Sequence, residues 1–559
     1  MKKKVKKKTQ PKNQVKQLSG SQRLFAWLDE NILLVLSGIL LAFIPLYPKI
    51  PLFDIIPGYI VRVRTEDLLI LVTLGVFFVQ LLRKKISLKT PLTKPILAYA
   101  VVGLLSVISA ILIIHTVPLQ LLHVGKTTLH YLRYLEYFSL FFITYVSVKS
   151  KKDLKILFAV IVATLLGVVI YGVGQKYLYW PVYSTMNREF SKGIRLYLTE
   201  HARVQSTFAG HYDLGAWLVI ILPLVLSLAY GLKNRWLKLL THLIFWSGVW
   251  LLVVSAARTS FIAFGFAMFV FILVLSLKQK SFWSKTGFFF SRSFYIYGLT
   301  LILMLGFGHD LQERLAQVIE SNPQAKTTIV QLQETKTNLT KKTLIALHLK
   351  KPEKPKNGLS TDEAARIVLK SDQRPVTKRP SDVYVDIPDK VTVATRSAEG
   401  KVTVTTITKE RTYSANAMKY GLSVAIRLDA LWPQAIKGFL RNPLTGSGYA
   451  TLNKQGVYQF TEADGTDNNY LRTLGETGLL GFIIFYGIII YTLKLSYDFA
   501  KKTKDKFLWA ITIGFMAGSL GLLLNATYID VFAASKVAMT YWAVVGLVLA
   551  SFKLKNHEA

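Results

Sequence analysis

Residues 427–481 read RLDALWPQAIKGFLRNPLTGSGYATLNKQGVYQFTEADGTDNNYLRTLGETGLLG and place a dense polar cluster directly before an apolar segment. The stretch closes the longest hydrophilic loop of the chain. Polar and ionisable groups are costly at membrane depth, so such a cluster beside a span is a candidate functional site. We interpret the stretch as half of an active site at a membrane surface, with the other half supplied by the rest of the chain.

The apolar residues of the chain are gathered in blocks. The chain has 559 residues, 52% of them hydrophobic, and its mean hydropathy is +0.36. Blocks of roughly 17–25 apolar residues have the length that a helix needs to cross a bilayer. The pattern predicts an all-α polytopic membrane protein with twelve spans. The spans are expected near 31–47, 67–82, 95–114, 129–148, 154–174, 214–231, 237–255, 260–277, 288–307, 479–495, 507–526 and 537–552.

The charge distribution orients these spans. Lys and Arg number 69 against 32 Asp and Glu, which gives a net charge of +37. The basic residues form short runs between apolar blocks, a pattern typical of cytoplasmic loops near anionic headgroups and not of nucleic-acid binding. We therefore expect an integral plasma (inner) membrane protein with both termini in the cytoplasm. The basic loops are 83–89, 148–155, 233–238, 278–285 and 499–506.

The same reading divides the chain into regions. Residues 1–30 form a basic cytoplasmic tail, which either touches lipid headgroups or is simply solvated. Residues 31–307 hold spans one to nine, and 479–559 hold the last three spans and a short cytoplasmic tail. The extracytoplasmic loop 308–478 contains an accessory insertion at 322–414, which either binds a polymer or is a tolerated surface insertion. Within it, period-two alternation on both sides of Ala398-Glu399-Gly400 predicts a β-hairpin.

Several arginines fall at the predicted outer ends of spans. Arg258 lies in SAARTSF, a very short turn, and Arg203 lies in HARVQSTFAGHYDLG before the sixth span. Arg427 begins the closing stretch, and Arg441 and Arg472 follow it. Arginine binds phosphate through paired, charge-assisted hydrogen bonds, so the group indicates a site for an anion such as a lipid phosphate. The alternative for Arg258 is an arginine that anchors the helix at the interface.

Acidic candidates are fewer. Asp467 in GTDNNYL precedes the tenth span and is a candidate base, although Asp is also a favoured helix N-cap. Glu476 lies nine residues further on, where it can pair with Arg472 at i,i+4. Glu136 and Arg133 are expected to form a structural pair, and Asp530 is a further outward candidate.

Other site types lack their sequence patterns. His201 and His211 are ten residues apart, and no HExxH spacing occurs, so no metal site is predicted. The absence of a GxxxxGK[ST] motif argues against an ATP-driven pump. The chain has no cysteine, which excludes disulfides and thiolate chemistry. No cofactor is expected.

These motifs together resemble the O-antigen ligase and O-antigen polymerase superfamily of membrane glycosyltransferases. Arg427, Trp432, NPLTGSGYATL, DNNYL and GETGLLG follow the order and approximate spacing of that family. SAARTSF and ARVQSTFAGHYDLGAWL resemble its two earlier arginine-bearing motifs, and RVRTEDLLI and LRYLEYFSLFF resemble its N-terminal spans. The resemblance covers nearly all of the chain except the basic tail and residues 322–414.

The resemblance implies a GT-C-like transferase that needs no nucleotide sugar and no metal. Its donor is a glycan on polyprenyl pyrophosphate, and its acceptor is another glycan or a wall polymer outside the membrane. By the family pattern, Arg203, Arg258 and Arg427 bind the pyrophosphate, while Asp467, Asn468 and Glu476 are candidate catalytic residues. Ligases of the family usually carry His-Asn where this chain has Asp467-Asn468, so a carboxylate would be the base here. This difference weakens ligation onto a lipid A core and leaves open polymerisation, or transfer to a wall polymer or a protein.

Two functions of other classes compete with the enzyme. A flippase of lipid-linked sugars also has about twelve spans, but it should carry charges at mid-span and two related halves. A wall-anchoring protein would depend on the accessory insertion, so deleting 322–414 would abolish its function.

Overall fold

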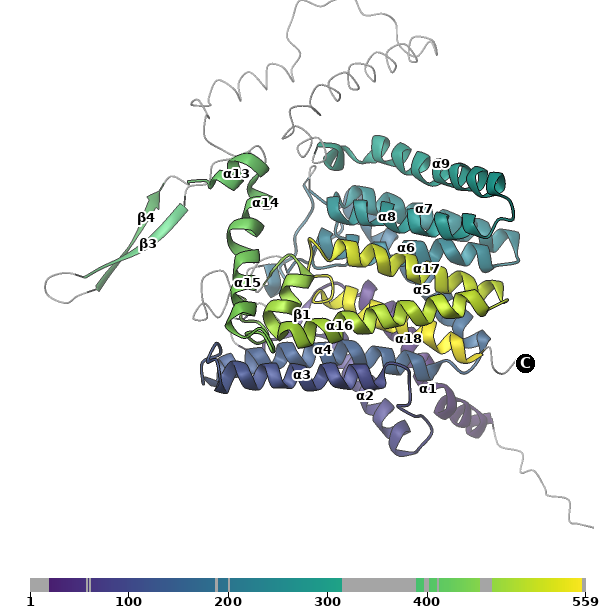
Figure 1. Cartoon of the computed structure of the whole chain (residues 1–559), viewed down its shortest axis with the longest axis horizontal. Coiled ribbons are helices and arrows are strands. Elements are labelled where there is room, and N and C mark those ends of the chain that lie inside the picture. Colours follow the sequence, from purple (N-terminus) through teal and green to yellow (C-terminus); the bar gives the residue numbers. More distant parts are fainter. Residues whose placement is uncertain are drawn as a thin grey trace, which may run out of the picture.

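The computed structural model describes residues 20–56, 59, 62–185, 190–199, 202–313, 389–396, 402–409, 412–452 and 465–554. Long, roughly parallel and antiparallel helices form one bundle (Figure 1). They are α1 (Gly20–Leu46), α2 (Thr65–Leu82), α3 (Thr93–Leu112), α4 (Leu121–Ser147), α5 (Lys151–Tyr177), α6 (His211–Gly231), α7 (Arg235–Val254), α8 (Arg258–Leu277), α9 (Phe282–Phe307), α16 (Asn469–Lys502), α17 (Lys506–Asn525) and α18 (Ser535–Leu554).

Eleven of these helices are long and apolar enough to span a membrane. The remaining one, α4, has 27 residues but carries Lys126, Arg133 and Glu136 along its length. Each of the twelve apolar segments expected from the sequence corresponds to one of the long helices. The all-α polytopic class is therefore confirmed for the described residues, while the count of twelve spans stays a prediction that depends on α4.

The predicted basic loops come together at one end of the bundle. Arg83 and Lys85 both pair with Asp29, and Lys149 donates to the carbonyl of the next residue, Glu30. Lys151 pairs with Asp505, and the Lys278 ammonium lies 3.4 Å from the Trp509 ring centre. Gly231, just before the 233–238 loop, packs on the backbone of Phe507. The loops are thus on a common side, as the charge pattern required. That this side is cytoplasmic remains a prediction.

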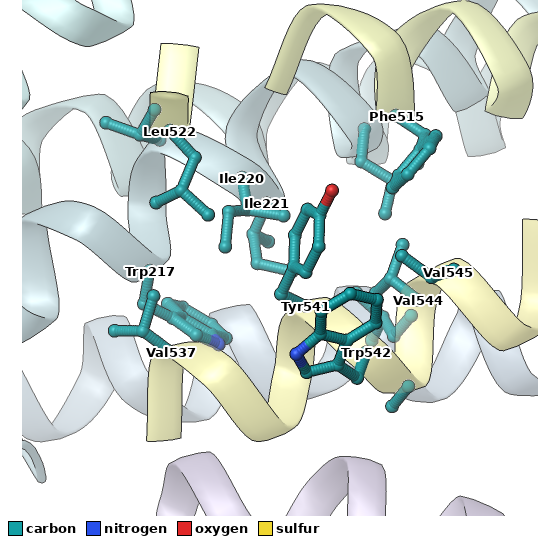
Figure 2. Packing of buried hydrophobic residues seen from close by; sticks show 14 of the residues in the cluster. Trp217, Ile220, Ile221, Phe515, Leu522, Val537, Tyr541, Trp542, Val544 and Val545 are labelled. Atoms are coloured by element: carbon teal, nitrogen blue, oxygen red, sulfur yellow. The ribbon is translucent and has the colours of Figure 1, made fainter. Parts of the chain in front are cut away.

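Three helices form the centre of the bundle. The spans of α6, α17 and α18 are 89%, 78% and 83% buried, whereas α9 is 11% buried and lies at the edge. Trp217 of α6, Phe515 of α17, and Tyr541 and Trp542 of α18 pack together there (Figure 2). A helix that is apolar on all sides can be buried by neighbours all around it, which places these three inside.

The predicted β-hairpin is confirmed. Strands β3 (Asp389–Arg396) and β4 (Val402–Lys409) are antiparallel, with Asp389 opposite Lys409 and Arg396 opposite Val402. The predicted turn at residues 398–400 lies outside the described residues, as do residues 1–19 of the basic tail and 322–388 of the insertion. A second, smaller ribbon of β1 (Pro51–Phe53) and β2 (Val63–Arg64) lies between α1 and α2. The proposed region boundaries stay predictions.

The closing stretch lies across one end of the bundle. This stretch forms α13 (Ala415–Tyr420), α14 (Leu422–Ile426), the π turn η2 (Arg427–Leu431) and α15 (Trp432–Arg441). Helices α14 and α15 run across the direction of the long helices (Figure 1). The chain turns between α13 and α14 at Gly421, whose φ of +82° favours glycine. This arrangement carries η2 and α15 over the end opposite the basic loops.

Candidate active site

Two motifs of the closing stretch pack against each other. The backbone N–H groups of Ser447 and Gly448 donate to the carbonyls of Gly475 and Glu476 at 2.9 and 3.0 Å. Gly446 has a φ of +71°, and a Cβ there would lie 2.4 Å from the carbonyl carbon of Glu476. Because no side chain fits this contact, the NPLTGSG loop and the GETG segment are joined through glycine.

The same contact interrupts α16. Gly478 has non-helical angles, with φ 65° and ψ −167°, and divides the helix into a short first part and a long second part. The N–H groups of Leu479 and Leu480 donate to Pro443 and Leu444 instead of to α16 itself. The tenth span was expected to begin at 479, which is the residue after this break.

Arg427 is buried at the start of η2. One of its nitrogens donates to the carbonyl of Ser423, and the guanidinium lies 5.0 Å from the ring centre of Tyr528. Its Nη2 is 3.0 Å from Oδ2 of Asp467, whose side chain is 42% exposed. π turns are frequent at functional sites. The pair presents a half-exposed carboxylate supported by a buried cation.

Asp467 is not the helix cap. Asn468 caps α16 by accepting the N–H of Leu471 at 3.0 Å, whereas Asp467 lies one residue earlier with a φ of +51°. The capping alternative for Asp467 is therefore wrong, because the neighbouring amide already fills that role. Non-glycine residues with such a φ are uncommon and often mark functional sites.

Asp530 supports the loop that carries Asp467. Its carboxylate accepts the backbone N–H groups of Thr466, Asp467 and Asn468 at 2.8, 3.2 and 3.1 Å. It also pairs with Nη1 of Arg472 at 3.1 Å. Asp530 thereby fixes the backbone on both sides of the candidate base, a positioning role that the sequence alone did not indicate.

Glu476 points inward. Its side chain is 2% exposed, accepts the N–H of Ala450 at 3.1 Å, and lies 3.4 Å from Nε of Arg472. The expected i,i+4 pair is thus present. These contacts suit a residue that holds the loop against α16, and they leave Glu476 further from open surface than Asp467.

Arg203 and Arg258 lie where α6, α7 and α8 meet. Arg203 contacts Nε2 of His211, the first residue of α6, and its neighbour Val204 donates to the carbonyl of Val254 at the end of α7. Arg258 is the first residue of α8, directly after a turn in which Ala256 has a φ of +49°. Both arginines therefore belong to the end of the bundle that α15 crosses.

The end of α17 connects this group to Asp467. Asn525 donates to the hydroxyl of Ser260, two residues after Arg258, at 3.0 Å. The next residue, Ala526, accepts the N–H of Asn469, two residues after Asp467, at 2.8 Å. The start of α8 and the start of α16 are thus tied to consecutive residues of one short segment.

A cavity of about 890 Å³ adjoins the site between α2 and α4. Its lining includes the cations Lys49, Arg62, Arg64, Arg133 and Arg472 and the carboxylates Asp67, Glu136 and Asp213. The rest of the wall is mostly aliphatic and aromatic. The wall reaches the surface of the bundle, where Leu71 is 65% exposed. Arg472 is shared, since it lines the cavity and pairs with Asp530. Arg203, Arg258 and Arg427 are not among the lining residues.

Sequence reasoning missed the cations of this cavity. Arg64 is 8% exposed and its Nε has no hydrogen-bond partner among the described residues. Arg133 forms the expected pair with Glu136 at 2.8 Å, but it also pairs with Asp67 at 2.6 Å and faces the cavity. Burial lowers the pKa of Lys49, helped by the charge of Arg64 and opposed by Glu66. The charged residues within the motifs RVRTED and LRYLEYF were the sequence feature that could have indicated this cavity.

No group of three or more His, Asp or Glu side chains with metal-binding spacing occurs within the part of the chain that the structure describes. His201 lies outside that part, and His211 is engaged by Arg203.

The family comparison covers the closing stretch. Residues 391–486 match the O-antigen ligase family model. The match begins inside β3, so it includes most of the hairpin. A comparison with curated proteins gives no match. The match to this segment, which contains Arg427, Asp467 and the packed glycine motifs, supports the chain's placement in the O-antigen ligase superfamily.

Proposed function

We propose that this protein transfers a glycan from a polyprenyl pyrophosphate carrier to an acceptor hydroxyl at the extracytoplasmic face of the plasma membrane. The observation that carries the proposal is the exposed carboxylate of Asp467 beside the buried cation of Arg427, tied through residues 525–526 to the start of α8. The superfamily match supports the class of reaction. The GT-C-like architecture and the membrane side belong to the same proposal.

The proposed chemistry is a displacement at the anomeric carbon. The acceptor oxygen forms the new glycosidic bond while the bond between that carbon and the pyrophosphate oxygen breaks, and the acceptor proton passes to the carboxylate of Asp467. Negative charge grows on the leaving pyrophosphate, and preorganised cations stabilise it. In this proposal Arg203 and Arg258 stabilise the charge on the pyrophosphate, and Arg427 lies beside the base, Asp467.

The cavity between α2 and α4 supplies a place for the carrier. Its apolar wall reaches the lipid-facing surface and suits a prenyl chain. The lining also holds five Lys and Arg side chains against the three carboxylates of Asp67, Glu136 and Asp213, so cations are in excess. Arg472 connects this lining to the Asp530 support of the catalytic loop. A lipid-linked donor could therefore enter from the membrane and present its pyrophosphate beside Asp467.

The test is turnover of the purified protein in lipid nanodiscs with a polyprenyl pyrophosphate glycan and an acceptor glycan. Arg258→Ala and Asp467→Asn should each abolish most of the transfer. Arg235→Ala is a matched control, because Arg235 is the first residue of α7 at the opposite end of the bundle. Full activity of both site variants would refute the assignment.

The product distinguishes the remaining candidates. A ligase gives one transfer to a foreign acceptor, whereas a polymerase gives a ladder of donor-derived repeats. A flippase gives no new glycosidic bond and only moves the lipid-linked sugar between leaflets.

A further inference from the structure

Helix α15 has two unlike faces. Ala435 and Gly438 are buried, and a Cβ at Gly438 would lie 2.5 Å from Leu452, so this narrow face packs tightly on the loop beneath. On the outer side Ile436 and Leu440 are 46% and 65% exposed. They are four residues apart and so lie on the same side of the helix. This apolar edge has no cover from the described residues.

The apolar edge continues into the lipid-facing surface of the bundle. Leu444, just after α15, is 61% exposed, and its carbonyl accepts the N–H of Leu480 of α16 at 3.2 Å. Asn442 donates to Ser109 in the last turn of α3 at 3.0 Å. Exposed apolar residues close in sequence to these two contacts are Leu112, Ile113, Leu479, Leu480 and Ile483. The edge of α15 is therefore level with the ends of two candidate membrane spans.

Basic residues accompany the edge. Lys437 and Arg441 are both exposed and again lie four residues apart on α15. In Figure 1, α15 runs across the helix ends and not along them. An amphipathic helix with this pattern of apolar and basic residues lies in the membrane interface, with its apolar side in the acyl boundary. Anionic headgroups complement the two cations.

We propose that α15 is an interfacial helix that binds anionic lipid, with Ile436, Leu440 and Leu444 in the acyl boundary and Lys437 and Arg441 on headgroup phosphates. This inference does not depend on the reaction proposed above. It has a structural consequence, because η2 runs directly into α15 and carries Arg427. The position of the buried cation beside Asp467 is then set partly by the lipid surface.

The absence of cysteine from the chain allows a direct test with single labels. The Ile436→Cys and Leu440→Cys proteins are labelled with a nitroxide in nanodiscs of phosphatidylcholine and phosphatidylglycerol. Collision with oxygen, which concentrates in lipid, is compared with collision with a water-soluble nickel chelate. We expect oxygen to dominate at both positions and nickel to dominate at a label on Asp429→Cys, an exposed position in η2.

The lipid charge is tested in the same proteins. Removing charge with Lys437→Gln and Arg441→Gln should lower the ratio of immersed to water-exposed label about fivefold for each residue. Lys437→Arg with Arg441→Lys should leave the ratio unchanged. Nickel-dominated labels at 436 and 440 would refute the proposal, because they would show that this edge faces water. Dipolar coupling between labels on separate molecules would indicate that a second copy of the chain covers the edge. An oxygen-to-nickel ratio that stays the same in the Lys437→Gln and Arg441→Gln proteins would refute the contact with headgroups.

Discussion

The carboxylate of Asp530 accepts the backbone N–H of Asp467 at 3.2 Å, together with the N–H groups of the residues on either side of it. This contact joins the segment between α17 and α18 to the loop before α16. It holds Asp467 at a positive φ with its own carboxylate turned to Arg427. The candidate base is thus positioned by a second carboxylate that is remote in sequence.

The first prediction concerns this support. Asp530→Ala should reduce turnover at least tenfold, because three N–H groups and the Arg472 cation lose their common acceptor. The free energy of unfolding should fall by about 3 kcal/mol, the cost of breaking a largely buried ion pair. Asp530→Asn keeps an acceptor oxygen and should retain more activity. Turnover and denaturant titration measure the two effects, and equal activity of Asp530→Ala and the native chain would contradict the assignment.

The second prediction separates the base from the cap. Asp467→Asn should lower turnover by about 10²–10⁴-fold with little change in stability, as expected for loss of a general base. Asn468→Ala removes the cap of α16 and should cost about 1 kcal/mol of stability. Asp429→Asn, a nearby exposed carboxylate in η2, serves as the control and should keep normal turnover. If Asp467→Asn loses stability and keeps its rate, the residue is structural.

The third prediction concerns the break in α16. In Gly478→Ala the new Cβ would lie 2.4 Å from the carbonyl of Leu444, at a φ of 65° that disfavours side chains. We expect a loss of more than 1 kcal/mol in the free energy of unfolding, together with reduced turnover. Gly487→Ala lies in the same helix with nothing within 4 Å of the new Cβ and should be neutral. Comparable unfolding of the two variants would show that the contact contributes nothing.

The fourth prediction concerns a buried lysine. The ammonium of Lys536 donates to the carbonyls of Pro45, Tyr47 and Thr207, and so ties α1, α18 and the loop after Arg203 together. Lys536→Met should lower the free energy of unfolding by about 3 kcal/mol, since buried carbonyls lose a charged donor. Lys553→Met, at the other end of α18, loses only the cation–π contact with the Tyr145 ring and should cost about 1 kcal/mol or less. Denaturant titration of both variants makes the comparison.

The sequence predicted the existence of the long helices, because hydrophobic length and basic loops are local properties. The span 507–526 differs from α17 by one residue at each end, and 260–277 differs from α8 by two residues at its start. The starts of α1, α4 and α16 lie eight to eleven residues before the predicted ones, because polar turns extend these helices beyond their apolar segments. The hairpin was likewise predicted from its period-two pattern, and β3 and β4 confirm it. The start of the tenth span coincides with the break at Gly478.

The site was only partly predictable. Residue type and order singled out Arg203, Arg258, Arg427 and Asp467, but capping could not be assigned because Asp467 and Asn468 are both good caps. The hydrogen bond from the Leu471 N–H to the Asn468 side chain decides it, while Asp530 accepts the backbone N–H of Asp467. The cavity cations were missed because Arg64 and Arg133 resemble ordinary helix-end charges until α2 and α4 enclose them.

By itself, the sequence determined the all-α membrane class and the existence of each long apolar helix, and it named candidate residues for a phosphate, since these follow from local hydrophobicity and side-chain chemistry. Only the tertiary structure decided which of those residues share an environment. Asp530, Arg472, Asp467 and Arg427 become one cluster because the glycine contact between the 442–448 loop and α16, and the junction after α17, bring distant segments together. Such contacts depend on close backbone approach, which no spacing along the chain reveals.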